Sequence, residues 1–136
     1  MNITRATQTT IAQKTEAKPV SQARVLLHLE GLTIFIGAIM LYAHINGNWL
    51  LFGALILAPD LSFFAYGINK QVGSMVYNAV HLTTIPAILL AIGLATETEI
   101  AVTVSIIWFA HIYMDRAVGY GFKYITDFKD THMSRV

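Results

Sequence analysis

The sequence contains four apolar segments, each about as long as a helix that crosses a lipid bilayer. They cover residues 25–45, 49–68, 72–94 and 100–119. A helix of about 20 residues, rising 1.5 Å per residue, spans the ~30 Å hydrocarbon core of a membrane. The segments lack the short alternating pattern of barrel strands. The predicted fold is therefore all-α, a four-helix transmembrane bundle with antiparallel neighbours.

Composition supports this class of protein. Charged residues make up 12% of the 136-residue chain and hydrophobic residues 55%, whereas about 25% of the residues of a soluble domain are charged. The net charge of +1 argues against a nucleic-acid partner. The absence of cysteine excludes disulfides, zinc–thiolate sites and thiol catalysis. The expected partner is the lipid bilayer.

Lysine and arginine residues predict the orientation. They occur in the N-terminal tail, at Lys70 in the second loop and in the C-terminal tail, but not in the first or third loop. Because cytoplasmic loops are enriched in these residues, both termini are expected to be cytoplasmic. We predict a flexible cytoplasmic tail over residues 1–22, a transmembrane domain over 23–121 and a cytoplasmic tail over 122–136.

Ionisable residues lie inside the predicted helices at matching depths. His111 and Asp115 are four residues apart and share one helix face. Measured from the cytoplasmic end of its own helix, each ionisable residue lies roughly 9–15 Å into the membrane. We therefore expect a polar site in the cytoplasmic half of the bundle, formed by Glu30, Asp60, His81, His111 and Asp115.

Imidazoles and carboxylates on several helices are typical ligands of zinc, iron or manganese in a bundle core. Asn78, one turn before His81, and Arg116 are expected to surround these ligands. Pro59 removes a helical hydrogen bond beside Asp60, and lipid tolerates such a break where the backbone faces protein or a cavity. No established metalloenzyme motif is present, so no catalytic residue is assigned.

Two other interpretations of these residues remain open. Glu30 with Arg116, and Asp60 with His81, would form a purely structural polar network. Alternatively, two histidines on different helices would ligate haem b, although the nearby carboxylates are unusual for a haem pocket.

Two classes of function fit a polar site of this kind. The first is a metal-dependent membrane hydrolase acting on a lipid-like substrate, in which a bound water becomes the nucleophile and a carboxylate acts as general base. The second is a non-enzymatic protein, either a small transporter or an interaction subunit, in which the same groups bind a cation or relay protons.

Four sequence blocks carry a family resemblance: LAPDLS (57–62), YNAVH (77–81), HIYMDRAVGYGFKY (111–124) and FKDTH (128–132). Together they resemble the signature blocks of domain-of-unknown-function family 4260, a family of small bacterial membrane proteins. The resemblance extends from about Leu26 to the C-terminus. It implies a four-helix integral protein of the bacterial inner membrane, with no assigned activity and no known catalytic residue.

Overall fold

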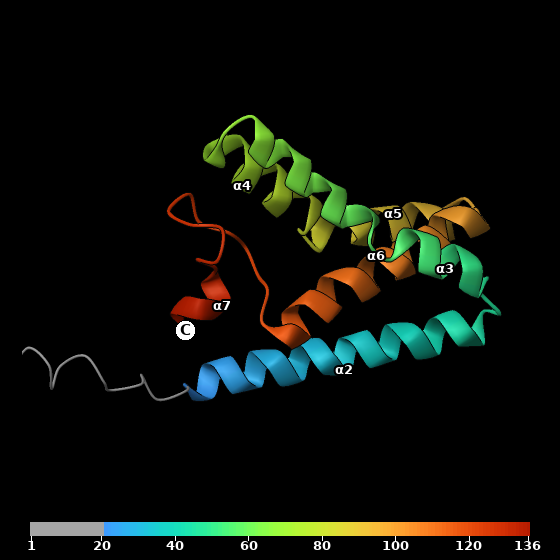
Figure 1. Cartoon of the computed structure of the whole chain (residues 1–136). Helices are drawn as coiled ribbons and strands as arrows, with labels where there is room; N and C mark the ends of the chain where they lie inside the picture. Colours follow the sequence, from blue (N-terminus) through green and yellow to red (C-terminus); the bar gives the residue numbers. More distant parts are fainter. Residues whose placement is uncertain (1–20) are drawn as a thin grey trace, which may run out of the picture.

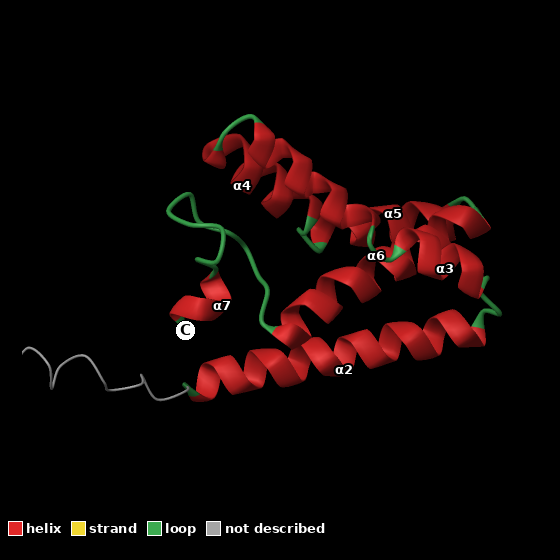
Figure 2. Cartoon of the chain, viewed as in Figure 1, coloured by secondary structure: helices red, strands yellow, loops and turns green. Residues whose placement is uncertain are grey.

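A computed structural model of the chain describes residues 21–136, so the predicted tail over 1–22 lies almost wholly outside the described residues. The described part is all-α, and within it no β-strand forms (Figure 2). Its elements are α2 (Gln22–His44), α3 (Trp49–Leu55), the 3₁₀-helix η1 (Ala58–Gly67), α4 (Lys70–Val80), α5 (Thr84–Ala95), α6 (Glu99–Val118) and α7 (His132–Arg135).

Four helical stretches are long and apolar enough to cross a membrane, as the sequence predicted. They are Gln22–His44, Trp49–Gly67, Lys70–Ala95 and Glu99–Val118. Their outer surface is strongly apolar: the side chains of Leu50 and Phe64 are 83% and 81% exposed. Burying that surface in lipid removes it from water, so the fold is that of a membrane protein.

Two of these stretches are interrupted inside the predicted membrane-spanning segments. The stretch over 49–68 changes from α-helix to 3₁₀-helix after Leu57, directly before Pro59. The stretch predicted over 72–94 is divided into two helices, because α4 ends at Val80 and α5 starts at Thr84. Pro86 explains the second break, since it has no N–H to donate to the carbonyl of Leu82 and its ring crowds that carbonyl.

Local capping residues fix the helix ends. The side chain of Asn48 accepts hydrogen bonds from the first turn of α3, and the side chain of Asn69 does the same for α4. Gly119 ends α6 in the left-handed conformation with φ of 100°, a geometry that glycine adopts without steric cost.

Helix α6 is the centre of the molecule and packs against both α2 and α5, while η1 packs against α4 (Figure 1). The η1–α4 pair leans away from α2, and the segment over residues 120–136, including α7, lies between them in this view. We call residues 120–136 the C-terminal segment. Its first residues, Tyr120 to Phe122, line a small hollow together with residues of α4 and α6.

Candidate metal centre

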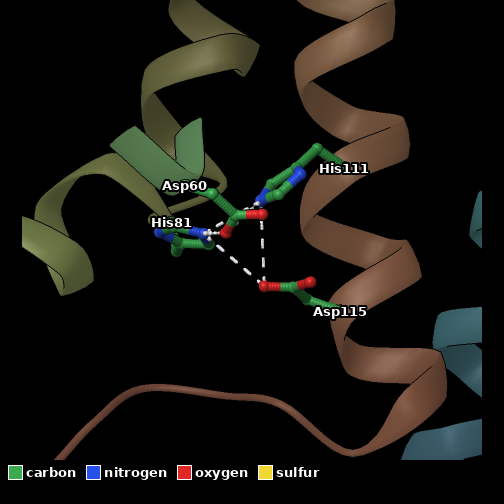
Figure 3. Close-up of side chains that lie close together, drawn as sticks. All are labelled: Asp60, His81, His111 and Asp115. Carbon is green, nitrogen blue, oxygen red and sulfur yellow. Dashed lines mark hydrogen bonds and ion pairs between the residues drawn. The ribbon is translucent and has the colours of Figure 1, made fainter. Parts of the chain in front are cut away.

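Two histidines and two aspartates point toward one another where η1, α4 and α6 meet (Figure 3). Asp60 lies in the first turn of η1, and His81 is the C-cap residue of α4. His111 and Asp115 lie one turn apart on α6. One nitrogen or oxygen atom of each side chain lies within 4.8 Å of those of the other three. We call these residues the His/Asp cluster, and they lie close enough to hold a metal ion.

The distances match those between the ligands of one small cation. The Nε2 atoms of His81 and His111 are 3.0 Å apart. The Oδ2 atom of Asp115 lies 3.5 Å and 3.7 Å from these two nitrogens, and the Oδ1 atom of Asp60 lies 3.9 Å and 3.5 Å from them. Four ligands placed about 2.1 Å from a tetrahedral zinc ion would be about 3.4 Å from one another.

The protonation of His81 is fixed by its own helix. Its Nδ1–H donates a hydrogen bond of 2.8 Å to the carbonyl of Tyr77, which can only accept. In the neutral imidazole the proton therefore resides on Nδ1, and Nε2 presents its lone pair to the cluster. Histidines that bind metals are commonly held this way, with the second ring nitrogen donating to a carbonyl or carboxylate.

Tyr77 also holds Asp115. Its hydroxyl donates to Oδ2 of Asp115 over 3.1 Å, and its ring stacks on the imidazole of His81 with centroids 3.8 Å apart. Tyr77 is 1% exposed. A single buried side chain thus orients two members of the cluster.

The two aspartates differ in exposure. The side chain of Asp60 is 32% exposed and that of Asp115 is 13% exposed, whereas the imidazoles of His81 and His111 are almost fully buried. Nδ1 of His111 is buried without a hydrogen-bond partner among the described residues. The protein therefore fixes the tautomer of His81 but not that of His111, and Asp60 is the member most accessible from outside.

Both interruptions of the helices lie at the cluster. Asp60 directly follows Pro59 at the start of η1, and His81 directly follows the end of α4. A 3₁₀-helix of ten residues is unusually long, and such stretches often mark functional positions. In membrane proteins, discontinuous helices form binding sites because their free backbone groups are tolerated only inside protein or at a cavity.

The C-terminal segment closes the cluster at the end where α6 terminates. The side-chain amide of Asn78 accepts from the backbone N–H of Lys123 over 2.7 Å and donates to its carbonyl over 2.9 Å. The Lys123 side chain is buried, and its ammonium donates to the carbonyl of Phe128 over 3.0 Å. Burial lowers the pKa of this ammonium, while the carboxylates of Asp115 and Asp60 oppose the shift.

The structure does not bring the remaining predicted site residues into the cluster. Glu30 is exposed on α2 and lines a small hollow beside Arg116 and His132, outside the cluster. The guanidinium of Arg116 donates to Oγ1 of Thr83 over 3.2 Å, and no ion pair joins it to Glu30 among the described side chains. Asn78 binds the backbone of the C-terminal segment instead of a cluster residue.

Sequence reasoning missed the roles of Tyr77 and Lys123. Tyr77 lies four residues before His81, the same spacing that places His111 and Asp115 on one face, so its position could have been found. Nothing in the sequence after Gly119 indicates that the Lys123 side chain turns inward, because its position depends on a loop held by Asn78.

An apolar cleft of about 260 Å³ is lined by neighbours of three cluster residues, although no cluster residue lines it. Three of its lining residues are close to cluster residues in the chain. Pro59 directly precedes Asp60, Val80 directly precedes His81, and Ile107 lies one turn before His111 on α6. The remaining lining is formed by Leu55, Ala58, Val104 and Trp108.

Fold and site together define an all-α membrane protein with an internal His/Asp cluster. The family model described as Domain of unknown function (DUF4260) matches residues 24–136, and the chain belongs to this family. The family resemblance seen in the sequence is thereby confirmed. No curated protein and no solved structure matches the chain.

Proposed function

We propose that this protein is a metal-dependent membrane hydrolase. The observation that carries the proposal is the convergence of two imidazoles and two carboxylates within 4.8 Å of one another, at a break in two membrane-spanning stretches. In this assignment His81, His111 and Asp115 hold a divalent cation of the zinc, iron or manganese type. Glu30 is left out of the ligand set because it lies outside the cluster.

The charge of the cluster supports binding of a cation. The carboxylates of Asp60 and Asp115 face each other across the two imidazoles in a site that is largely removed from water. The neighbouring cation, Lys123, donates to the carbonyl of Phe128 and not to either carboxylate. Buried charges are costly unless they are paired or coordinate a metal, so a divalent ion would relieve the repulsion between Asp60 and Asp115.

Asp60 is assigned as the general base because it is the most exposed member of the cluster. When bound, a divalent cation supplies the Lewis acidity that makes water a nucleophile near neutral pH. The carboxylate of Asp60 accepts a proton from the attacking water, whose oxygen forms a bond to the substrate. The same proton then passes from Asp60 to the leaving group as the scissile bond breaks. Tyr77 keeps Asp115 oriented throughout.

Proton or cation transport is the less favoured function. A relay across the membrane needs polar groups on both sides of the cluster. Toward α3, the cleft beside the cluster is lined among the described residues by apolar side chains, including Leu55, Val104 and Ile107. Haem is disfavoured as well, since Nε2 atoms 3.0 Å apart leave no space for a porphyrin between His81 and His111.

The proposal includes an orientation with both termini in the cytoplasm of a bacterial inner membrane and antiparallel neighbouring spans. The positions of lysine and arginine support it. In this orientation the His/Asp cluster opens toward the cytoplasm beneath the C-terminal segment.

Elemental analysis of the purified, detergent-solubilised protein tests the proposal. We expect about one equivalent of zinc, iron or manganese after loading and removal of excess ion. A folded protein that retains none of these metals under any loading condition would overturn the proposed function.

A further inference from the structure

The apolar cleft next to the His/Asp cluster is the feature that bears on the substrate. Pro59, Val80 and Ile107 line the cleft and belong to the same backbone stretches that carry Asp60, His81 and His111, so the cleft lies beside the cluster although no cluster residue lines it. The indole N–H of Trp108 donates to the carbonyl of Val80 over 2.8 Å. This bond satisfies both polar groups and leaves an apolar wall.

We propose that the substrate is an amphiphile whose alkyl chain occupies this cleft and whose hydrolysable polar group reaches the His/Asp cluster. This inference rests on the proposed function. The membrane supplies such molecules directly, because the surrounding surface of the protein is apolar and lipid-facing. An alkyl chain in the cleft would hold the adjoining polar group at the cluster, which is the positioning effect that accelerates a bound reaction.

A second apolar hollow on the same protein provides an internal comparison. It also measures about 260 Å³, and it is lined by residues of α2, α5 and α6, including Gly37, Leu90 and Phe109. None of its lining residues is a chain neighbour of a cluster residue. The two hollows are alike in volume and apolar lining, and only the first is lined by chain neighbours of cluster residues.

Alkyl hydroxamates test the inference without requiring turnover. Their polar end chelates divalent metals, and their chains can be varied in length. We would measure the Kd of acetohydroxamate and octanohydroxamate for the metal-loaded protein, in the parent and in the cleft-filling variants Val104→Phe and Ala58→Phe. Gly37→Phe is the matched control, since Gly37 lines the second hollow and a Cβ atom added there meets no atom within 4 Å.

The ratio of the two Kd values is the informative quantity, because partition of octanohydroxamate into detergent affects every variant equally. We expect the parent and Gly37→Phe to favour octanohydroxamate by about tenfold more than the two cleft-filling variants do, which corresponds to roughly two buried methylene groups. Acetohydroxamate should bind all four proteins alike.

Two results would overturn the inference, and they have different meanings. Equal ratios in all four proteins, with acetohydroxamate bound, would reject the alkyl-chain site and leave the metal centre intact. Absence of metal from the folded parent would reject the proposed function and this substrate class with it.

Discussion

The two ring nitrogens of His81 have their partners on two different helices, Tyr77 on α4 and His111 on α6. Nδ1–H donates to the carbonyl of Tyr77, and Nε2 lies 3.0 Å from Nε2 of His111. If both Nε2 atoms presented lone pairs, they would repel each other. Either Nε2 of His111 carries a proton and donates it to Nε2 of His81, or a cation lies between the two atoms. The nearby carboxylates of Asp60 and Asp115 favour the cation.

The side chains of His111 and Asp115 are expected to be required for metal binding. His111→Ala and Asp115→Asn each remove a ligand, so the affinity for metal should fall by more than the ~10–100-fold typical of losing an outer partner. Metal content and thermal stability are measured together. His44→Ala, an exposed histidine at the end of α2, and Arg116→Ala should keep the metal of the parent. Normal metal content in His111→Ala would contradict the assignment.

The hydroxyl of Tyr77 is expected to tune the centre. Tyr77→Phe keeps the stacking on His81 but removes the hydrogen bond to Asp115, so metal affinity should fall by about 10–100-fold while the protein remains folded. Metal affinity is measured by competition with a chelator. Tyr113→Phe, on α6 but outside the cluster, is the control. Equal affinities in these two variants would show that the Tyr77 hydroxyl has no role in binding.

At the residue scale, the sequence predicted which residues contribute to the cluster better than it predicted where each side chain points around its helix axis. Spacing placed His111 and Asp115 on one face, and helix depth brought Asp60 and His81 to the same level. Depth says nothing of the direction in which a side chain points around its helix axis. Glu30 has the right depth and yet lies outside the cluster, because packing of α2 against α6 decides which face of α2 turns inward.

Among the elements, the two interrupted stretches differ in how well their prolines predicted the position of the break. Pro59 predicted the disturbance beside Asp60. Pro86 had the same power at the third stretch, but it acts on the carbonyl four residues earlier, so the break falls at residues 81–83 and not at the proline itself. That displacement places His81 at a helix end, which the apolar pattern over 72–94 could not indicate.

Close packing of α2 on α6 depends on Gly31. A Cβ atom built there would lie 2.8 Å from the backbone nitrogen of Ala117, which cannot easily move. Gly31→Ala should therefore lower stability by about 1–3 kcal/mol. Gly37→Ala on the same helix meets no atom within 4 Å and should be neutral or gain up to ~1 kcal/mol from helix propensity. Unfolding of the two solubilised variants gives the comparison, and equal effects would contradict close packing at Gly31.

The folded C-terminal segment is expected to lose stability in acid as the carboxylate of Asp130 becomes protonated. Hydrogen bonds from Arg135 and Thr126 lower the pKa of this carboxyl from 3.8 to about 2. A carboxyl with a lowered pKa stabilises the fold above its unfolded pKa, and this contribution is lost as the pH falls from about 4 to about 2. The melting temperature of the parent should therefore decline more over this window than that of Asp130→Asn. Parallel declines would contradict the prediction.

For the whole molecule, the orientation can be tested with single cysteines, because the chain has none of its own. Ile45→Cys and Thr98→Cys should react with an impermeant maleimide added outside the cell. Lys70→Cys and Lys129→Cys should react only after the membrane is opened. Labelling of Lys70→Cys from outside would reverse the inferred side of the cluster.

The bond between Asn78 and Lys123 has a consequence for biosynthesis. All four candidate spans precede Lys123 in the chain, so they can enter the membrane before the C-terminal segment docks on α4. The His/Asp cluster would then exist for a time without its cover. We expect the nascent protein to acquire metal most readily in this interval, and the finished protein to exchange it slowly.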